Sequence, residues 1–323
     1  MYKSFFKLTR NPFEVSPDPY FLYTTPQHNE ALAGLYYGIT ARKGFMVLTG
    51  EVGTGKTLVG RCLLDLLDRN KIAYAYVFNS LLSSRQFLHY VVEDLGVSYR
   101  TPSKSDLLLQ LNTHLMKRYQ QGQGTVLVVD EAQHLSVSVL EEIRLLTNLE
   151  TAEGKLLQIV LVGQPELDSK LESHELRQLK QRIALRFRLQ ALTELQTRGY
   201  IERRLRVAGD ESAGIFSLPA LYRIYLASRG IPRLINILAD NALIAAYALG
   251  QRRVTSSILD EVAADLQLTA TADSPAGTER GTNGGPPLQA AEAGEVPDRG
   301  FQGYEDSGTL LADQIPYSTR GKK

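Results

Sequence analysis

Two kinds of hydrophobic pattern alternate along residues 1–190. Short continuous apolar runs are typical of parallel strands covered on both faces, and apolar residues that recur every three or four positions are typical of amphipathic helices. The alternation predicts an α/β fold, a parallel, doubly wound sheet flanked by helices. Strands are expected at 45–49, 72–78, 125–129, 156–162 and 186–189, and helices at 27–40, 58–67, 83–95, 103–121 and 137–149.

The strand pattern stops near residue 191, and only helical patterns follow as far as residue 268. Helices are expected at 193–207, 218–228, 232–249 and 255–266, which together predict a small all-helical lid domain. Thr193 and Thr255, like Ser103 before an earlier helix, are suited to N-caps, and Pro232 is suited to a first helical turn.

The two ends of the chain differ from the rest. Residues 1–26 contain prolines that favour an extended strap over a helix, and the aromatic residues Phe13, Tyr20 and Tyr23 either pack on the core, which we favour, or flank a base. Residues 269–323 are rich in Gly, Pro, Ala, Ser and Thr without apolar periodicity, which predicts a disordered tail. The predicted domains are a core with its strap (1–190), a lid (191–268) and a tail (269–323).

Composition narrows the class of protein only slightly. Apolar residues make up 43% of the 323 residues, enough for a sizeable core, and the net charge of +1 creates no overall attraction to nucleic acid or membrane. The single cysteine, Cys62, can form no internal disulfide, lies on an apolar helix face and fits a cytoplasmic setting. No apolar run approaches the ~20 residues of a membrane span, so no transmembrane segment is expected.

A glycine-rich turn followed by Lys-Thr connects the first predicted strand to a helix, with the sequence Gly50-Glu51-Val52-Gly53-Thr54-Gly55-Lys56-Thr57. The pattern G-x-x-x-x-G-K-[ST] between a strand and a helix is typical of a phosphate-binding loop. Its glycines let backbone N–H groups point at phosphate oxygens, and the helix N-terminus adds its positive dipole. Lys56 is expected to contact the β/γ-phosphates and Thr57 to ligate Mg²⁺. The alternative is a glycine-rich turn that binds nothing.

Two carboxylates, Asp130 and Glu131, follow the apolar strand at 125–129. We expect Asp130 in the Mg²⁺ shell and Glu131 to polarise an attacking water; the alternative is an acidic strand end at a helix N-terminus. Gln164 follows the next buried strand and, if the two strands are neighbours, lies beside the γ-phosphate, where it senses phosphate or orients water; otherwise it is a turn residue. Asn79 is a weaker candidate, for a hydrogen bond to Glu131 in an inactive state.

Basic residues outnumber acidic ones nine to two between Arg177 and Arg206. Three explanations compete: a solvated basic face, an arginine finger that reaches a neighbouring subunit's nucleotide, and binding to the phosphate backbone of DNA. Arg233 stands in the first turn of a predicted lid helix, where the helix dipole disfavours a cation, and this favours a phosphate partner.

Together these residues resemble the AAA+ ATPases and, within them, the ExeA/GspA-like group related to TniB/TnsC/MuB-type ATPases. Beyond the phosphate loop, the matching pieces are Asn11-Pro12-Phe13, Pro17-Asp18-Pro19, Arg42-Lys43-Gly44-Phe45, Asp130-Glu131-Ala132-Gln133, Asn148-Leu149-Glu150, Gly163-Gln164-Pro165-Glu166-Leu167, Gln181-Arg182-Ile183 and Gly230-Ile231-Pro232-Arg233. Members of the group continue into a membrane span and a peptidoglycan-binding domain. Neither is recognisable in this sequence, so direct binding to the cell wall is not expected.

The resemblance implies a P-loop NTPase with ATP and Mg²⁺ as cofactors, bound at the interfaces of a homo-oligomer, commonly a ring or filament. It also implies that Gln164 is sensor 1, that Arg233 is sensor 2, and that an arginine finger lies between Arg177 and Arg186. We prefer Arg182 as the finger and keep Arg177 and Arg186 as alternatives. The expected site thus has Glu131, Lys56, Gln164, Arg182 and Arg233 as catalytic residues; Gly50, Glu51, Val52, Gly53, Thr54, Gly55, Lys56, Thr57, Leu58 and Arg233 around the nucleotide; and Thr57 and Asp130 on the metal.

The favoured hypothesis is a cytoplasmic ATP hydrolase that serves as a switch or assembly factor for a secretion or exopolysaccharide system of the cell envelope, held at the inner membrane where protein partners recruit it. The main alternative is a DNA-binding ATPase that regulates transposition or repair. A third hypothesis is a nucleotide-gated scaffold with little turnover, against which the intact Glu131 argues.

Overall fold

The computed structural model describes residues 2–14, 21, 23–78, 81–212 and 214–268. Residues 1–268 form one compact unit, and the predicted tail, Tyr20 and Asn79 lie outside the described residues. The helices and strands, in chain order, are α1 (Tyr2–Phe6), α2 (Pro26–Thr40), β1 (Phe45–Gly50), α3 (Lys56–Arg69), β2 (Ala73–Val77), α4 (Ser84–Asp94), α5 (Lys104–Gln120), β3 (Thr125–Val129), the 3₁₀ helix η2 (Ala132–His134), α6 (Val137–Leu146), β4 (Gln158–Gly163), α7 (Pro165–Leu171), the 3₁₀ helix η3 (His174–Leu176), α8 (Arg177–Lys180), β5 (Ile183–Leu189), α9 (Glu194–Val207), α10 (Leu218–Ser228), α11 (Pro232–Ala248) and α12 (Ser256–Asp265).

The strands form one parallel sheet in the order β2-β3-β4-β1-β5. In this order β4 lies between β1 and β3, with Thr49 opposite Gly163 and Val129 opposite Leu161. The carboxyl ends of these three strands therefore meet at one edge of the sheet. In open α/β sheets this edge is where ligands bind.

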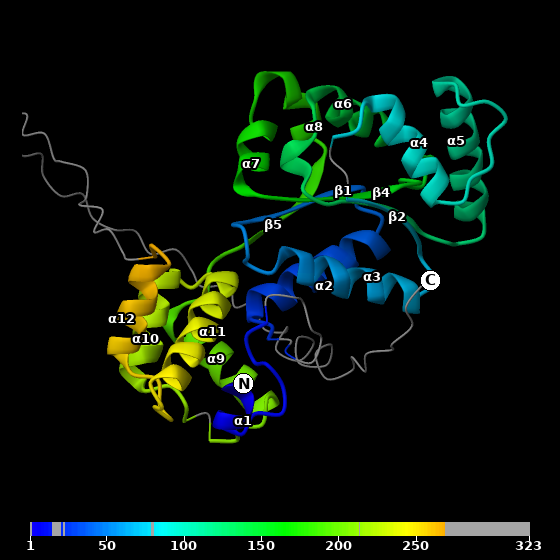
Figure 1. Ribbon diagram of the computed structural model, residues 1–323. Helices are drawn as coiled ribbons and strands as arrows, with labels where there is room; N and C mark the ends of the chain where they lie inside the picture. Colours follow the sequence, from blue (N-terminus) through cyan, green and yellow to red (C-terminus); the bar gives the residue numbers. More distant parts are fainter. Residues whose placement is uncertain (1, 15–20, 22, 79–80, 213, 269–323) are drawn as a thin grey trace, which may run out of the picture. The chain divides into compact units, whose positions relative to one another are not determined.

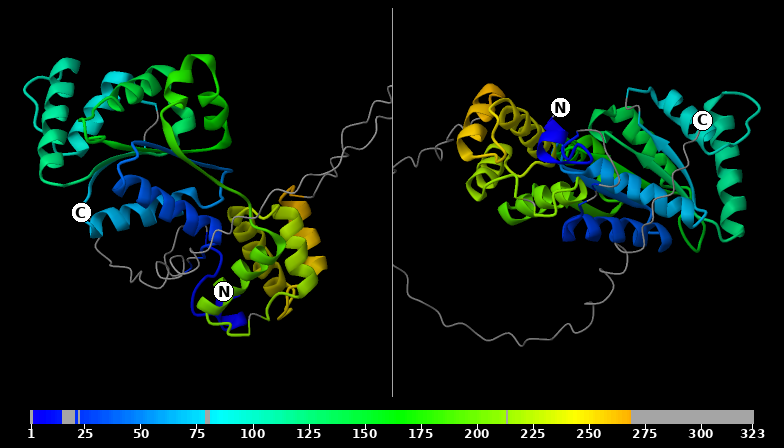
Figure 2. Two further views of the ribbon diagram at one scale, coloured as in Figure 1. Left: turned by 180° about the vertical axis from the view of Figure 1, so that it is seen from behind. Right: turned by 60° about the horizontal axis from the view of Figure 1, so that its bottom comes forward.

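Helices cover both faces of the sheet, which confirms the predicted α/β class. In Figures 1 and 2, α2 and α3 lie on one face and α4 to α8 on the other. Along β1, Phe45 and Val47 join the apolar cluster under α4, α5 and α6, while Met46 and Leu48 join the cluster under α2 and α3. Successive residues of a strand point to opposite faces, so burial on both faces requires a continuous apolar run.

The strand β5 is longer than predicted. It occupies the sheet edge next to β1 and begins at Ile183, whereas the sequence predicted only 186–189. Its residues alternate between half-buried and exposed as far as the buried Leu189. A strand covered on one face carries arginines on the other, and these interrupt the apolar run on which the prediction depended.

The helices after residue 190 pack around a second apolar core, formed mainly by residues of α9 to α12 (Figure 1). The N-terminal segment joins this core, and its prediction was partly wrong. Residues 2–6 are helical rather than extended, because no proline precedes Pro12. The helix also lets the Phe5 ring pack edge-to-face against Tyr247 and the Tyr2 hydroxyl donate to Asp240 (2.6 Å).

Two of the three aromatic residues of the N-terminal segment pack, as favoured. They contact aromatic residues of the helical part after residue 190 rather than residues of the sheet: Phe13 contacts Phe216, and Tyr23 contacts Tyr200. The division of the chain at residue 190 stays a prediction.

Three predicted helix starts carry the expected residues. The side chains of Ser103 and Thr193 accept hydrogen bonds from backbone N–H groups of the first turn, and Pro232 begins α11. Thr255 stands at the N-cap position of α12 without a side-chain cap bond. Cys62 is buried in α3. Within the part of the chain that the structure describes, no helix is long and apolar enough to cross a membrane.

Candidate functional site

The phosphate loop leaves the buried strand β1 and enters α3 at Lys56. Gly53 and Gly55 have φ angles of +83° and +101°, in the region that favours glycine. Gly55 is the N-cap of α3 and gives no side-chain cap, so the first N–H groups of this 14-residue helix have no capping side chain. Unsatisfied N–H groups at the positive end of a helix are suited to bind an anion.

Neighbouring segments leave no room for side chains at the loop glycines. A Cβ at Gly50 would lie 2.8 Å from the carbonyl oxygen of Leu189, and one at Gly53 would lie 2.7 Å from the Cβ of Arg233. The latter contact places the start of α11 against the loop. The predicted sensor residue Arg233 thus lies beside the loop, with an exposed side chain.

Lys56 is buried in the loop, where its Nζ donates to the carbonyl oxygens of Gly50 (2.7 Å) and Glu51 (2.8 Å). Burial lowers the pKa of the Lys56 ammonium, while the carboxylates of Glu131 and Asp130 act in the opposite direction. Both predicted carboxylates therefore lie near enough to the lysine to act on its charge, so the three groups share one site.

The remaining loop residues range from buried to exposed. Thr54 is buried and its hydroxyl donates to the carbonyl oxygen of Glu51 (2.8 Å). Thr57 is exposed in the first turn of α3, and Leu58 is half-buried. Val52 is 48% exposed, a large apolar side chain that faces solvent. The structure therefore leaves the Thr57 hydroxyl accessible to a ligand.

Asp130 and Glu131 follow β3 directly. Asp130 accepts a hydrogen bond from the Tyr76 hydroxyl (2.8 Å) on Oδ2 and from the backbone N–H of Glu131 (2.8 Å) on Oδ1. Burial, together with the negative charge and the hydrogen bond of Asp130, raises the pKa of Tyr76, so this hydroxyl stays a donor at neutral pH. Tyr76 thus fixes the orientation of the predicted metal ligand.

Glu131 has a φ of +50° and a carboxylate held by two glutamines. Its Oε2 accepts from Nε2 of Gln133 (2.6 Å) and from Nε2 of Gln164 (3.3 Å). Burial tends to raise the pKa of Glu131, but the two hydrogen bonds and the charge of Lys56 outweigh it, so the pKa is lowered. The carboxylate is ionised at neutral pH and can accept a proton.

The sequence analysis missed Gln133, which connects the ends of two strands. Its Nε2 donates to Glu131, and its Oε1 accepts from the backbone N–H of Gln164 (3.0 Å). Because β3 and β4 are neighbours, the side chain of Gln164 reaches Glu131, a contact that the sequence analysis did not predict. The predicted place of Gln164 beside a γ-phosphate stays a prediction. Gln133 follows the two carboxylates in the sequence, but nothing in that pattern shows that its side chain turns back to them.

The three candidate arginine fingers differ in their contacts. Arg182 donates to the Arg144 carbonyl oxygen (3.3 Å), to the Thr147 hydroxyl and to the Asn148 side chain, all near the end of α6. Arg186 is paired with Asp168 (3.6 Å). Among the described residues, Arg177 has no ion-pair partner, and its side chain is exposed. The structure does not bring these arginines into contact with the loop residues.

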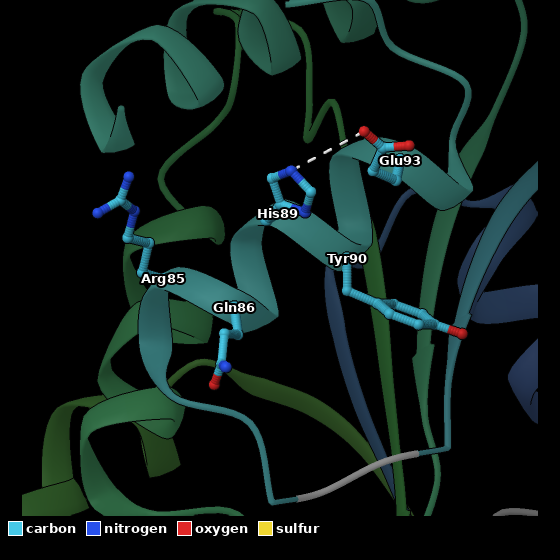
Figure 3. A pocket seen from close by; sticks show the side chains of 5 residues that line it. All are labelled: Arg85, Gln86, His89, Tyr90 and Glu93. Carbon is cyan, nitrogen blue, oxygen red and sulfur yellow. Dashed lines mark ion pairs between the residues drawn. The ribbon is translucent and has the colours of Figure 1, made fainter. Parts of the chain in front are cut away.

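A shallow pocket of about 270 Å³ lies elsewhere, on α4. It is lined by Arg85, Gln86, His89, Tyr90 and Glu93, and none of them is a predicted site residue. Figure 3 shows His89 directed toward Glu93, an ion pair at 3.9 Å, while Tyr90 points away from both. The pocket is separate from the site described above.

Comparison with known proteins agrees with this geometry. A family model described as an AAA domain matches residues 39–171. General secretion pathway protein A of Aeromonas hydrophila is 47% identical over 255 residues, which cover 79% of this chain and 46% of that protein. Residues 39–171 therefore belong to the AAA domain family, and the chain has the AAA+ fold. The GspA-like resemblance expected from the sequence is confirmed, and the chain spans about half the length of this relative.

Solved structures agree on the AAA+ fold. The Aeropyrum pernix ORC2 protein, solved in ADPNP-ADP complexes, has a TM-score of 0.56 at 16% identity, with 79% of this chain and 71% of that chain covered. Cdc6p of Pyrobaculum aerophilum has a TM-score of 0.57 at 21% identity, with 74% and 67% covered. Thermotoga maritima RuvB, a Holliday junction branch migration motor, has a TM-score of 0.51 at 16% identity, with 80% and 74% covered. At these identities the similarity concerns the fold alone.

Proposed function

We propose that this AAA+ protein hydrolyses ATP with the help of Mg²⁺. The observation that carries the proposal is the meeting of a phosphate loop, Lys56 and an ionised Glu131 at the carboxyl ends of β1, β3 and β4. The site fits the ligand: Gly53 and Gly55 have positive φ angles, and a Cβ at either would clash with Arg233 or His28, so only glycines allow this turn of the loop and its N–H groups. The Thr57 hydroxyl and the Asp130 carboxylate are the hard oxygen donors that Mg²⁺ prefers. When bound, Mg²⁺ neutralises charge on the phosphates.

The protein's own groups have separate roles in this proposal. The loop N–H groups and Lys56 bind and orient the phosphates, and Glu131 accepts a proton from the attacking water. Gln164 donates to the same carboxylate oxygen of Glu131 as Gln133 does, so a phosphate that draws the Gln164 amide away changes how Glu131 is held. This gives Gln164 a physical route to act as sensor 1.

Arg233 is proposed as sensor 2 because the start of α11 touches the loop at Gly53. A phosphate bound in the loop attracts this exposed guanidinium, and Arg233 then pulls on α11. The lid helices are in this way coupled to the nucleotide. Movement of the lid against the sheet is the mechanical output that we propose.

Completion of the site by a second copy in a homo-oligomer is also part of the proposal. Arg182 remains our choice for the arginine finger, and its contacts at the end of α6 would hold it ready on one surface. Arg177 is exposed and Arg186 is paired with Asp168, so Arg177 is the freer alternative. Mixing Arg182→Ala with Lys56→Ala in one oligomer should restore activity at interfaces that pair an intact loop with an intact finger. No recovery in a demonstrated mixed oligomer contradicts action between subunits.

The pathway that we favour is an envelope system, with protein partners that hold the ATPase at the cytoplasmic face of the inner membrane. Its support is the 47% identity to a protein named for the general secretion pathway. The DNA-binding alternative depended on the basic segment, whose charge is partly neutralised: Lys180 pairs with Glu172, and Arg198 and Arg206 both pair with Glu202. ATP-dependent DNA binding that weakens steeply with salt would reverse this preference.

Two variants test the ATPase itself. Lys56→Ala should lose ATP binding, because it removes the loop's charge. Glu131→Gln should bind ATP normally but turn over about 10²- to 10⁴-fold more slowly, since it removes the general base. Lys117→Ala and Glu261→Gln, at exposed positions of α5 and α12, are the matched controls. Turnover at the wild-type rate in Glu131→Gln refutes the assigned role.

A further inference from the structure

His28 is a buried histidine that the proposed mechanism does not use. It lies in the first turn of α2, is only 5% exposed, and faces the phosphate loop from a helix 26 residues earlier in the chain. One ring nitrogen contacts Thr25, the N-cap of α2, and the other contacts the carbonyl oxygen of Thr54 in the loop. A single imidazole therefore joins the start of α2 to the loop.

The hydrogen bonds determine which nitrogen carries the proton. The backbone N–H of Thr25 donates to Nδ1 of His28 (3.3 Å), so Nδ1 is an acceptor. The Thr25 hydroxyl accepts from the backbone N–H of His28 (3.4 Å) and is left to donate its own proton to Nδ1 (2.6 Å). Nε2 then carries the ring proton and donates it to the Thr54 carbonyl oxygen (3.0 Å). Burial lowers the pKa of His28, which keeps the ring neutral in this arrangement.

This hydrogen bond has a consequence for the next N–H group of the loop. In a trans peptide the C=O and N–H bonds point in opposite directions, so a Thr54 carbonyl held by His28 turns the N–H of Gly55 away from His28. Gly55 has a φ of +101°, and a Cβ there would lie 2.7 Å from Nε2 of His28. The closeness of the histidine is thus a second reason, besides backbone conformation, for glycine at this position.

We propose that His28 is a positioning residue for the phosphate loop, which holds the Thr54 peptide so that the Gly55 N–H faces the bound phosphates. The inference rests on the proposed nucleotide site, and it adds a residue outside the loop motif to that site. The competing explanation is that His28 serves only to cap α2 through Thr25. The two explanations differ in which ring nitrogen matters.

Three substitutions separate the two nitrogens. His28→Asn places an amide near the position of Nδ1, where it can still contact Thr25 but is too short to reach Thr54. His28→Gln extends its amide to about the position of Nε2 and can donate to the Thr54 carbonyl. His28→Met has the length of glutamine without a donor.

The experiment measures binding of a fluorescent ATP analogue with Mg²⁺ to the whole chain, together with thermal unfolding. We expect His28→Asn and His28→Met to bind about 3- to 10-fold more weakly than wild type, the value of one lost hydrogen bond, and His28→Gln to recover most of that loss. Weak nucleotide binding by His28→Asn and His28→Met, together with recovered affinity in His28→Gln, supports the proposal. If the Asn variant does not fold, the comparison of Gln with Met decides.

Other outcomes overturn it. Wild-type affinity in His28→Asn or His28→Met, with only a lower Tm, shows that the histidine is merely structural. If His28→Gln binds the nucleotide as weakly as His28→Met, a hydrogen-bond donor to Thr54 is not what the affinity depends on. If the wild type binds no nucleotide while its Tm is normal, the proposed function itself fails, and this result is distinguishable because it precedes any substitution.

Discussion

The substitution Gln133→Met removes the link between the ends of β3 and β4 while keeping the side chain's length. In the wild type, Nε2 of Gln133 donates to the Glu131 carboxylate at 2.6 Å, and Oε1 accepts from the backbone N–H of Gln164 at 3.0 Å. The thioether of methionine replaces neither contact. Gln133 is only 7% exposed, so water has little access to substitute for the lost groups.

The two lost hydrogen bonds differ in free energy and in their consequences. An N–H of Gln164 left without its acceptor costs about 1–2 kcal/mol of folding free energy, which lowers Tm by about 2–8 °C in a unit of this size. The hydrogen bond to the charged Glu131 is the stronger one, at about 1.5–3 kcal/mol. Without it Glu131 keeps only the longer bond from Gln164 and is positioned less firmly, so we expect kcat for ATP to fall about 10- to 100-fold.

The pH dependence distinguishes loss of positioning from loss of folding. The Gln133 hydrogen bond helps to lower the pKa of Glu131 because it stabilises the ionised form. Its removal raises that pKa, and a base must be ionised to act, so the acid limb of the rate profile should move to higher pH. A purely structural defect lowers the whole profile without moving the limb.

The assay is steady-state ATP hydrolysis by the whole chain over a series of pH values, with Tm measured on the same samples. Gln120→Met, at an exposed position near the end of α5, is the control for the chemistry of the substitution and should match the wild type. An unchanged acid limb and unchanged kcat in Gln133→Met, alongside the expected loss of Tm, would refute the idea that Gln133 positions Glu131.

Three further predictions concern stability and can be checked by thermal unfolding. The pKa of His28 lies below the value of about 6.5 for an unfolded histidine, so its contribution to the free energy of unfolding is complete above that value and is lost as the pH falls from there through the lower folded-state pKa; His28→Gln should flatten this acid loss, and an identical pH dependence contradicts the assignment. Gly230→Ala should destabilise the protein well beyond Gly250→Ala, because both have φ near +70° but only at Gly230 would the Cβ meet a carbonyl oxygen, at 1.9 Å; equal losses of Tm contradict this. Arg204→Met should cost about 2–4 kcal/mol, since the buried guanidinium donates to the Pro12 carbonyl and the Tyr200 hydroxyl, whereas a change under 1 kcal/mol means that these bonds contribute little.

Local sequence was sufficient for most of the sheet. The central strands are buried on both faces, and such strands must be apolar throughout, so their positions follow from the sequence alone. The edge strand β5 was predicted too short because one of its faces is exposed and carries arginines. The helix at Tyr2–Phe6 was missed because its support is the distant side chain of Tyr247, not its own five residues.

The candidate site divides in the same way. The phosphate loop and the two carboxylates could be predicted, because each depends on residues close together in the chain: glycines where φ is positive, and Asp130 and Glu131 at the end of an apolar strand. Which groups hold these residues could not be predicted. Gln133, Gln164 and His28 reach their partners only because the strand order places β4 beside β3 and the fold packs the start of α2 against the loop.

The physical reason is the range of the interactions. Backbone conformation, hydrophobic periodicity and a helix dipole act over a few residues, so the amino-acid sequence by itself determined the strands, the loop and the likeness to AAA+ ATPases. A hydrogen bond depends on distance and angle within a few tenths of an ångström, whatever the separation along the chain. Only the tertiary structure could decide that Glu131 is held by two glutamines and that a histidine contacts the loop that precedes α3.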